Sequence, residues 1–561
     1  MRLNRSVRLA TLFVAAAATV SAQTATGSII GRITDASGAF APGVEVTLLN
    51  PATGISTKVL GDDQGIYRAF YLTPGTYSLS FQKPGFSTLQ RSDVILRSND
   101  TLTIDAQLQV GNLVERVQVS AATPLLETAT STTGTVLEGR QMNAIPIMQR
   151  YTWMAMYLMP GVTSMNGFHI AGARDRGIGY QSDGIPATEP VRSGVATNRI
   201  MSTTNNAIEE VKMVTTVLPA DSGHSAGGML SITFKSGTND LHLEAEDRYI
   251  NNPLLHRAYF NLLRPTAPFS YHELSGLLSG PVYLPKIYNG KNRTFFLFGW
   301  SRHHEKYNQQ VFADVPDDAM LGGDFSFNGL GFPIFDPTST RQNAAGTWIR
   351  DAFPGNIVPR SRFDPVAVKF LSFQPWNKPN NLGGAGFVDR TGPHQNFGTE
   401  SKYRSYRTRW DTKIDHAFNE KNRIFGRYSH ARNRAWGNAI AINWELLDGN
   451  RVMLPSDQIN NVISDTHIFS PTLILETRLG MNRRKESRTP LGIGENWGQQ
   501  LGIPGISPET FPSFFNSGGG AFYSASMPRG SYYQVTENFT VQENLNIIRG
   551  RHAMKTGYEF V

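Results

Sequence analysis

One short segment of the chain has the residue types of a nucleophilic enzyme. Residues 223–227 fit the G-x-S-x-G pattern of a hydrolase nucleophile elbow, in which Ser225 would attack an acyl group. Such an elbow follows a buried strand and opens a helix, so that the serine is exposed above the sheet. Here Gly228 follows directly, and residues 229–234 alternate like another strand. We therefore interpret the motif as a turn, and a secreted serine hydrolase is the least favoured function.

The other residue types that carry chemistry lack the necessary spacing. None of the 12 histidines has a glutamate three residues later or a histidine four residues later, which removes the helical zinc motifs. His303, His304 and Glu305 lie in a strand-like run, where neighbouring side chains point to opposite faces. The sequence also has no cysteine, no complete phosphate loop and no dinucleotide-binding fingerprint. We therefore expect no catalytic residue, no metal site and no cofactor, and we expect that the protein is not an enzyme.

Composition places the chain among mainly β proteins. Hydrophobic residues make up 40% of the 561 residues and charged residues 17%, and the 53 glycines and 31 prolines are spread along the chain. Such a spread is typical of many short strands joined by turns. The formal net charge is +8, yet no block of five or more Lys and Arg residues exists, so we expect no nucleic-acid partner.

The N-terminus has the pattern of a cleaved secretion signal. Arginines at positions 2, 5 and 8 precede an apolar run over residues 9–20, and small residues follow as far as Ala22. The run is too short to cross the roughly 30 Å of membrane hydrocarbon as a helix. We therefore expect residues 1–22 to be a signal peptide and the mature chain to begin at Gln23. No later segment offers about 18 uninterrupted apolar residues, which argues against a helical membrane protein.

Residues 27–110 are predicted to form a small β-sandwich. Val44, Val46 and Leu48 would point inward while the residues between them face water. Residues 65–86 resemble the carboxypeptidase-regulatory-like domain, a transthyretin-type sandwich related in fold to carbohydrate-binding modules. The resemblance implies a docking surface for glycan or protein and no peptidase chemistry. Four alternating segments are expected as strands, residues 28–34, 44–49, 77–81 and 101–108.

The next region, residues 111–240, carries an ordered series of turn and strand motifs. An arginine-bearing turn at residues 170–176 precedes an Asp183-Gly184 turn, and two alternating segments then close on residues 235–239. The series resembles the α+β plug domain of Oar-like TonB-dependent outer-membrane receptors. The resemblance assigns these residues to the plug motif: Gly172, Arg174, Asp183, Gly184, Glu210, Gly223, Gly227, Gly228, Lys235, Ser236 and Gly237.

Residues 113–121 form a short apolar/polar alternation in an otherwise plain connector. By themselves they fit either a last edge strand of the sandwich or a linker. In the resembled family the matching segment is the TonB box, which adds as a strand to the periplasmic energy-coupling protein. Strand addition needs main-chain pairing more than particular side chains. The candidate TonB-box residues are Glu115, Arg116, Val117, Gln118, Val119, Ser120 and Ala121.

Residues 241–561 are predicted to be strands of a transmembrane antiparallel β-barrel. Over residues 409–415 the odd positions, Arg409, Asp411, Lys413 and Asp415, share one face and the even positions share the other. This is the lumen-in, lipid-out alternation that a membrane barrel requires. The alternation recurs beside three short turns, which belong at the periplasmic end, whereas long insertions would be extracellular loops. The expected turns are residues 418–422, 469–472 and 548–552, and the longest expected loop is residues 312–405.

The length of this last region is too small for a closed barrel around a plug. A plug of about 120 residues needs a barrel of about 22 strands, whereas roughly 320 residues with long loops hold around 10 to 14 strands of about 10 residues each. An open edge in lipid would leave backbone groups unpaired. Residues 555–561 also end within an alternating run. We therefore expect a partial barrel in a C-terminally truncated sequence whose remaining strands follow Val561.

The resemblance implies a function for the whole arrangement. Extracellular loops and plug would bind a ligand, and a TonB-type periplasmic energy-coupling protein would drive plug movement that imports the ligand into the periplasm. We therefore expect the protein in the outer membrane of a Gram-negative-type bacterium, surrounded by outer-membrane lipid. The basic lumen face suggests that the unknown extracellular ligand is anionic or carbohydrate-bearing. The alternative is a non-transporting adhesion or assembly protein of the same architecture.

Overall fold

The structure is a computed structural model, and the statements below concern the residues that it describes. These are residues 26–98, 100–111, 116–120, 133–145, 157–163, 169–173, 177–187, 203–216, 225, 227–255, 269–313, 316–326, 333–374, 377–380, 388–389, 392–393, 397–436, 452–470, 472–490, 496–506, 532–549 and 552–561. The expected signal peptide lies outside them and stays a prediction.

The N-terminal part is a sandwich of two sheets, as predicted. One sheet has the order β4-β1-β7, with β8 also paired to β1, and the other has the order β3-β2-β5-β6-β9. Val44, Val46 and Leu48 are fully buried between the sheets, which confirms the predicted inward face. The strands are β1 (Gly27–Asp35), β2 (Glu45–Leu49), β3 (Ser56–Leu60), β4 (Ile66–Leu72), β5 (Gly75–Gln82), β6 (Thr88–Leu96), β7 (Thr101–Thr103), β8 (Ala106–Leu108) and β9 (Arg116–Ser120).

Two details of the sandwich differ from the expected strands. Segment 101–108 is divided into β7 and β8, and at the break the Asp105 carboxylate accepts a hydrogen bond from the Arg32 N–H at 2.8 Å. The second sheet also gains β9 from the connector, which pairs in parallel with β6 from Thr88↔Arg116 to Ser92↔Ser120. Residues 116–120 of the candidate TonB box therefore form an edge strand of the sandwich.

The middle part, residues 133–237, is called the plug below and contains a five-stranded sheet of order β10-β15-β16-β13-β14. Its apolar cluster includes Ile208, Met213 and Leu230, together with Leu277 and Leu297 from the following sheet. The elements are β10 (Thr133–Glu138), α2 (Gly139–Ala144), β11 (Val162–Thr163), β12 (His169–Ile170), β13 (Ile178–Ser182), β14 (Ile185–Pro186), η4 (Asn205–Ala207), β15 (Ile208–Thr216) and β16 (Gly228–Phe234).

The C-terminal part is one antiparallel sheet of nine long strands in the order β17-β18-β21-β26-β27-β28-β29-β30-β31. Strands β17 and β31 are its two edges, and the sheet is not closed into a barrel. The strands are β17 (His242–Asn251), β18 (Phe269–Pro281), β21 (Thr294–Ala313), β26 (Phe397–Asn419), β27 (Asn422–Trp436), β28 (Val452–Ser470), β29 (Leu473–Pro490), β30 (Tyr532–Arg549) and β31 (His552–Phe560).

Connections at the two ends of this sheet have very different lengths. The three predicted short turns lie at one end, between β26 and β27, β28 and β29, and β30 and β31. The hairpin of β19 (Tyr283–Leu284) and β20 (Tyr288–Asn289) lies at that end too, and η5 (Asn252–Leu254) follows β17 at the other. The predicted loop 312–405 is shorter than expected, because β21 continues to Ala313 and β26 begins at Phe397.

The long connections contain short elements of their own. They are α3 (Asp318–Leu321), η6 (Pro337–Ser339), β22 (Arg341–Gln342), β23 (Trp348–Ile349), η7 (Pro354–Asn356), η8 (Arg360–Arg362), α4 (Pro365–Ser372), β24 (Val388–Asp389), β25 (Gly392–Pro393) and α5 (Trp497–Leu501). Among the described helices none is long and apolar enough to cross a membrane.

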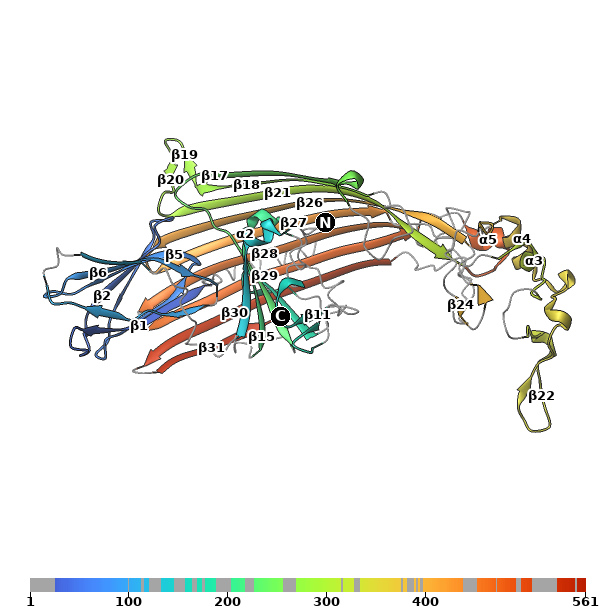
Figure 1. Ribbon diagram of the computed structural model, residues 1–561, viewed down its shortest axis with the longest axis horizontal. Coiled ribbons are helices and arrows are strands. Elements are labelled where there is room, and N and C mark those ends of the chain that lie inside the picture. Colours follow the sequence, from blue (N-terminus) through green and yellow to red (C-terminus); the bar gives the residue numbers. More distant parts are fainter. Residues whose placement is uncertain are drawn as a thin grey trace, which may run out of the picture.

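Figure 1 shows how the three parts are arranged. The sandwich lies at the short-turn end of the nine-stranded sheet, and α3, α4 and β22 extend from the opposite end. The plug lies against one face of the sheet, which we call the inner face, and the opposite side is the outer face. The inner and outer faces follow the alternation read from the sequence, since Arg409, Asp411 and Lys413 are almost fully buried while Ile414 is 49% exposed.

Candidate functional site

The Asp183-Gly184 turn of the plug is bound by the inner face of the sheet. Both residues have positive φ, 44° and 80°, as a two-residue hairpin turn between β13 and β14 requires. Asp183 Oδ2 lies 2.7 Å from Arg427 Nε, and both side chains are buried. The Arg427 guanidinium also donates to Ser182 Oγ at 2.7 Å and lies 4.0 Å from the centre of the Phe234 ring. One arginine of the sheet therefore holds the predicted turn by an ion pair, a hydrogen bond and a cation–π contact.

Strand β29 contacts the same hairpin from the other side. Arg478 Nη1 donates to the Gly184 carbonyl at 3.1 Å, and Asn482 Nδ2 donates to the Pro186 carbonyl at 2.7 Å. A Cβ atom at position 184 would lie 2.1 Å from Arg478 Nη1, so glycine there makes room for the guanidinium as well as adopting positive φ.

The four predicted lumen residues of β26 all contact the plug. Arg409 Nη1 donates to the Thr203 carbonyl at 3.1 Å, and Asp411 Oδ2 accepts from the Thr204 N–H at 2.7 Å. Further along the strand, the Lys413 ammonium donates to the Phe234 carbonyl at 3.3 Å, and Asp415 accepts from Ser236 Oγ at 3.2 Å. Alternate residues of one strand thus bind two separate segments of the plug, three of them through plug backbone atoms and Asp415 through a side-chain hydroxyl.

The last residues of the plug motif lie where plug, sheet and sandwich meet. Lys235 forms an ion pair with Glu244 of β17 at 3.2 Å. At Gly237 an added Cβ would lie 2.5 Å from the Phe296 carbonyl oxygen, so only glycine fits this close approach of two backbones. Asn239 then donates its backbone N–H to the Ala52 carbonyl of the sandwich at 2.8 Å.

A second buried polar contact joins the plug to the sandwich, and we call it the plug–sandwich contact. Lys212 Nζ lies 2.7 Å from Asp100 Oδ1, with the two side chains 6% and 11% exposed. The Ser98 backbone N–H donates to Glu210 Oε1 at 2.8 Å, and Ser98 Oγ lies 2.8 Å from Thr233 Oγ1. An ion pair and two hydrogen bonds therefore connect β15 and β16 with the segment between β6 and β7.

Burial raises the pKa of Glu210 to about 7 from an ordinary value of 4.5. The hydrogen bonds from Ser98 and the charge of Lys212 oppose this rise. The resemblance assigned Glu210 to the plug motif without a role, and the structure places it in the plug–sandwich contact. Sequence reasoning missed Ser98, Asp100 and Lys212, although a glutamate and a lysine inside the apolar strand β15 were a signal of buried charge.

Strand β16 is buried on both of its sides. Its apolar and hydroxyl residues alternate, and every residue of the strand is buried. Ser231 and Thr233 are 2% and 4% exposed, because their side is covered as well, with Thr233 against the sandwich. Gly227 precedes the strand and Gly228 begins it, and an added Cβ at either would lie within 3.0 Å of a neighbouring side chain of the plug.

The remaining motif residues have simpler positions. Gly172 has φ of +82° in the turn that follows β12. Arg174 and Gly223 lie outside the described residues, as do Glu115 and Ala121 at the two ends of the candidate TonB box.

The elbow interpretation of Ser225 lacks its structural context. Ser225 Oγ lies 3.0 Å from the Gly177 carbonyl and 2.5 Å from the Gly228 carbonyl, and it accepts from the Gly179 N–H at 3.2 Å. The chain continues into strand β16 rather than a helix. The hydroxyl therefore supports a turn between backbone segments, as the sequence predicted.

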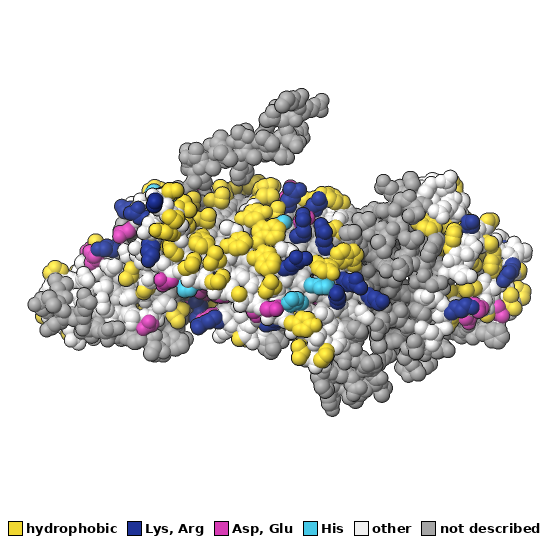
Figure 2. All heavy atoms as spheres, turned by 90° about the horizontal axis from the view of Figure 1, so that it is seen from above, with side chains coloured by type: hydrophobic (Ala, Val, Ile, Leu, Met, Phe, Trp, Pro, Cys, Tyr) yellow, Lys and Arg dark blue, Asp and Glu magenta, His cyan; other side chains and the backbone are white. Residues whose placement is uncertain are grey.

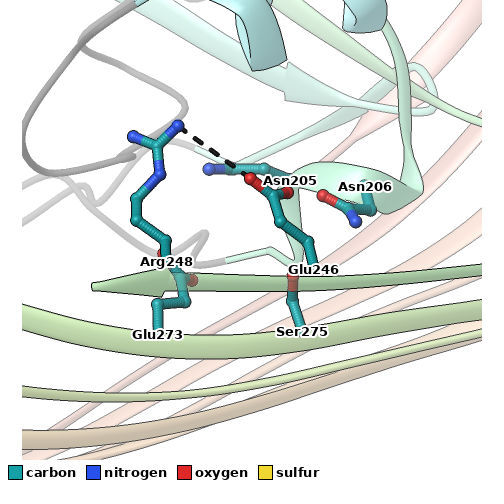
Figure 3. Close-up of a pocket in the computed structure, with 6 residues that line it drawn as sticks. All are labelled: Asn205, Asn206, Glu246, Arg248, Glu273 and Ser275. Atoms are coloured by element: carbon teal, nitrogen blue, oxygen red, sulfur yellow. Dashed lines mark ion pairs between the residues drawn. The ribbon is translucent and has the colours of Figure 1, made fainter.

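A small polar recess opens between the plug and the first two strands of the sheet (Figure 3). Arg248 and Glu246 form an ion pair of 3.9 Å at its side. Its lining consists of polar residues only: Asn205, Asn206, Glu246, Arg248, Glu273 and Ser275. Within the described residues, no group of three or more His, Asp and Glu residues could hold a metal ion.

Comparison with known proteins gives matches over most of the chain. The outer membrane beta barrel domain family matches residues 233–561, and the carboxypeptidase regulatory-like domain family matches residues 28–109. The TonB-dependent transporter Oar of Myxococcus xanthus is 30% identical over 256 residues, which are 43% of this chain and 24% of that relative.

Two of the solved structures that the chain resembles are those of an outer membrane transporter and an import receptor. The outer membrane transporter YddB from Escherichia coli has a TM-score of 0.44 and 10% identity, covering 76% of this chain and 47% of YddB. The ferric-catecholate import receptor Fiu from E. coli K12 has a TM-score of 0.36 and 14% identity, covering 77% of this chain and 59% of Fiu. The chain thus spans about half the length of these structures and, over the matched part, 24% of its curated relative.

Proposed function

The chain belongs to the outer membrane beta-barrel domain family, and on that premise we propose that it is a TonB-dependent receptor that imports an extracellular ligand into the periplasm. Its nine-stranded sheet lies in the outer membrane, with apolar residues of the outer face toward lipid. The short-turn end, which carries the sandwich, faces the periplasm, and the long connections face the cell exterior.

The polar contact between plug and sheet is the observation that carries this proposal. The contacts of Arg427, Arg478 and the inner residues of β26 with the plug are hydrogen bonds and ion pairs. When such contacts open into a wet pore, water replaces each partner, so that the net change per hydrogen bond is small. An apolar contact of the same area would lose its full burial energy on opening. The polar contacts therefore hold the plug specifically and can be exchanged for water. The apolar part of the plug–sheet contact, which includes Leu277 and Leu297 of the sheet, would have to open as well.

Energy coupling would act through the edge strand β9. Its other side has no neighbour in the described sheet, so that a strand of a TonB-type periplasmic protein can add there. Only residues 121–132 separate β9 from β10, the first strand of the plug. A pull on β9 would therefore reach the plug sheet directly.

The sandwich would close the periplasmic side until it undocks. The sandwich is bound to the plug by the Lys212–Asp100 ion pair. It is bound to the sheet by Arg423 of β27, which donates to Thr57 Oγ1 of the sandwich at 2.7 Å. We propose that residues 27–110, 111–240 and 241–561 act as a docking module, a coupling segment with plug, and a partial barrel.

The inner-face cations do not indicate the ligand. Arg409, Lys413, Arg427 and Arg478 bind plug carbonyls or Asp183, so that these four cations already have partners in the plug. We place ligand recognition in the extracellular loops and leave an anionic or carbohydrate-bearing ligand as a hypothesis for binding experiments.

The test uses Val117, in the middle of β9. Proline at this position removes a backbone N–H and cannot pair across the strand, whereas Val117→Thr keeps the backbone and serves as the matched control. We expect the purified periplasmic domain of the energy-coupling protein to bind the wild type and Val117→Thr and to lose binding to Val117→Pro. Equal binding by all three would remove the TonB-box assignment. Binding without any ligand-dependent uptake would favour the adhesion or assembly protein.

A further inference from the structure

The outer face of the sheet carries a row of cations at its extracellular end. Each of the four strands β21, β26, β27 and β29 contributes two Lys or Arg residues at outward positions, all of them exposed or half-exposed. We call these residues the basic belt: Arg302, Lys306, Lys402, Arg404, Arg432, Arg434, Arg483 and Lys485.

The belt lies directly beyond the apolar band of the same strands. Phe298, Ile414, Ile463 and Phe539 are 44–51% exposed on the outer face, nearer the periplasmic end. Over this lower part of β21 and β26–β29, none of the described outward residues is Lys or Arg. Figure 2 shows one view of this surface, in which Lys and Arg side chains gather beside a field of hydrophobic ones on the side away from the sandwich.

Interfacial aromatic residues mark the depth of the belt. His304 stacks on Tyr406 with ring centres 4.1 Å apart, and Tyr406 packs edge-on against Trp436 at 5.5 Å. All three residues point outward between the cations. Tyr and Trp collect where a barrel crosses from hydrocarbon to headgroups, so the basic belt lies at headgroup depth.

Positive charge in the belt exceeds what the protein itself balances. Three carboxylates share these outward positions against eight cations. They are Asp457, 2.9 Å from Arg432, Glu537, 3.1 Å from Arg483, and Glu400, which precedes Lys402 by two residues on β26. Lys306 is directly opposite Arg404 in the β21–β26 register, and like charges in opposed positions destabilise a sheet unless an anion lies between them. If these outward positions only faced water, acidic residues would serve there as well as Lys and Arg.

We propose that the basic belt binds phosphate-bearing lipid headgroups of the outer leaflet. Directly opposite residues of a sheet have Cβ atoms about 5 Å apart, so that Lys306 and Arg404 can both reach one phosphate, and the guanidinium fork matches phosphate oxygens in pairs. The acyl chains of the same lipid would lie on the apolar band below. The belt therefore recognises a lipid rather than the transported ligand. This proposal depends on the location of the sheet in the outer membrane and does not depend on transport.

The experiment compares two sets of three exposed cations. One variant combines Arg302→Gln, Lys306→Gln and Arg404→Gln, which removes three cations of the belt. The matched control combines Lys286→Gln, Lys291→Gln and Lys421→Gln, which removes three exposed cations at the short-turn end of the sheet, outside the belt. Protein extracted from the outer membrane into a neutral detergent is titrated with short-chain phosphatidic acid, phosphatidylcholine or inorganic phosphate, and bound lipid is counted by native mass spectrometry.

We expect phosphatidic acid to bind the wild type in preference to phosphatidylcholine. A cation beside an anionic lipid surface contributes roughly five-fold in affinity, so that the triple variant should bind phosphatidic acid on the order of a hundred-fold more weakly. The control should lose much less. Undiminished binding by the triple variant, or binding of inorganic phosphate as tight as that of phosphatidic acid, would overturn the proposal.

Discussion

Removal of Lys212 tests how firmly the sandwich is held against the plug. Lys212→Met keeps the length and the apolar stem of the side chain but leaves Asp100 as a buried carboxylate without its ion-pair partner, since the two side chains are only 6% and 11% exposed. Loss of one member of a buried pair costs about 3–5 kcal/mol. The undocked fraction should therefore rise by at least about 100-fold.

The absence of cysteine from the sequence provides the assay. Ser98→Cys places one thiol in the plug–sandwich contact, where Ser98 is 0% exposed, and its maleimide labelling rate reports the undocked fraction. In this background, Lys212→Met should accelerate labelling about 100-fold. Lys58→Met removes the exposed pair with Glu45, with side chains 53% and 43% exposed, and should change the rate less than about five-fold.

A double variant separates the charge effect from general damage. Lys212→Met with Asp100→Leu removes both charges, and replacement of a buried pair by apolar residues is often neutral. Slow labelling should therefore return. If Lys212→Met labels as slowly as the wild type, the plug–sandwich contact does not hold the sandwich, and the argument from buried charge is refuted.

Three further perturbations test other parts of the assembly. Burial raises the pKa of Glu210 to about 7 in the docked state from 4.5, so that docking is favoured below pH 4.5 and weakens as pH rises through 7. The labelling rate of the Ser98→Cys protein should therefore increase over this pH range, and Glu210→Gln should remove this increase. Arg427→Met should weaken plug retention by about 3–5 kcal/mol and admit a large antibiotic through the pore, whereas Arg432→Met removes an exposed pair and should not. Gly237→Ala adds a Cβ 2.5 Å from a backbone oxygen and should destabilise the protein by about 1–3 kcal/mol, which is measured as a lower unfolding temperature. A Cβ at Gly426 meets no atom within 4 Å, so that Gly426→Ala should leave the unfolding temperature nearly unchanged, and equal effects of the two substitutions would contradict the close-approach argument.

Periodicity in the sequence correctly indicated the two faces of the sheet. Along β26 each odd position from Arg409 to Asp415 contacts the plug, while Ile414 is exposed on the other face. The short turns and the Asp183-Gly184 hairpin were equally readable, because positive φ and chain reversal impose local residue types.

The sequence pattern could not predict which residues are buried by another domain. Strand β16 alternates like a half-exposed strand and is buried on both sides. The segment at residues 116–120 fitted both a coupling strand and an edge strand, and its pairing with β6 depends on how the chain returns to the sandwich. The basic inner face suggested an anionic ligand, whereas its cations bind the plug.

The sequence by itself determined the mainly β architecture, the inward and outward positions of each strand, and the turns, because these follow from contacts between residues close together in the chain. Only the tertiary structure decided which charges meet. Arg427 pairs with Asp183 across 244 residues, and Lys212 with Asp100 across 112. Such pairs arise from the path of the chain around the pore, and a local pattern of residue types carries no information about a partner so far away.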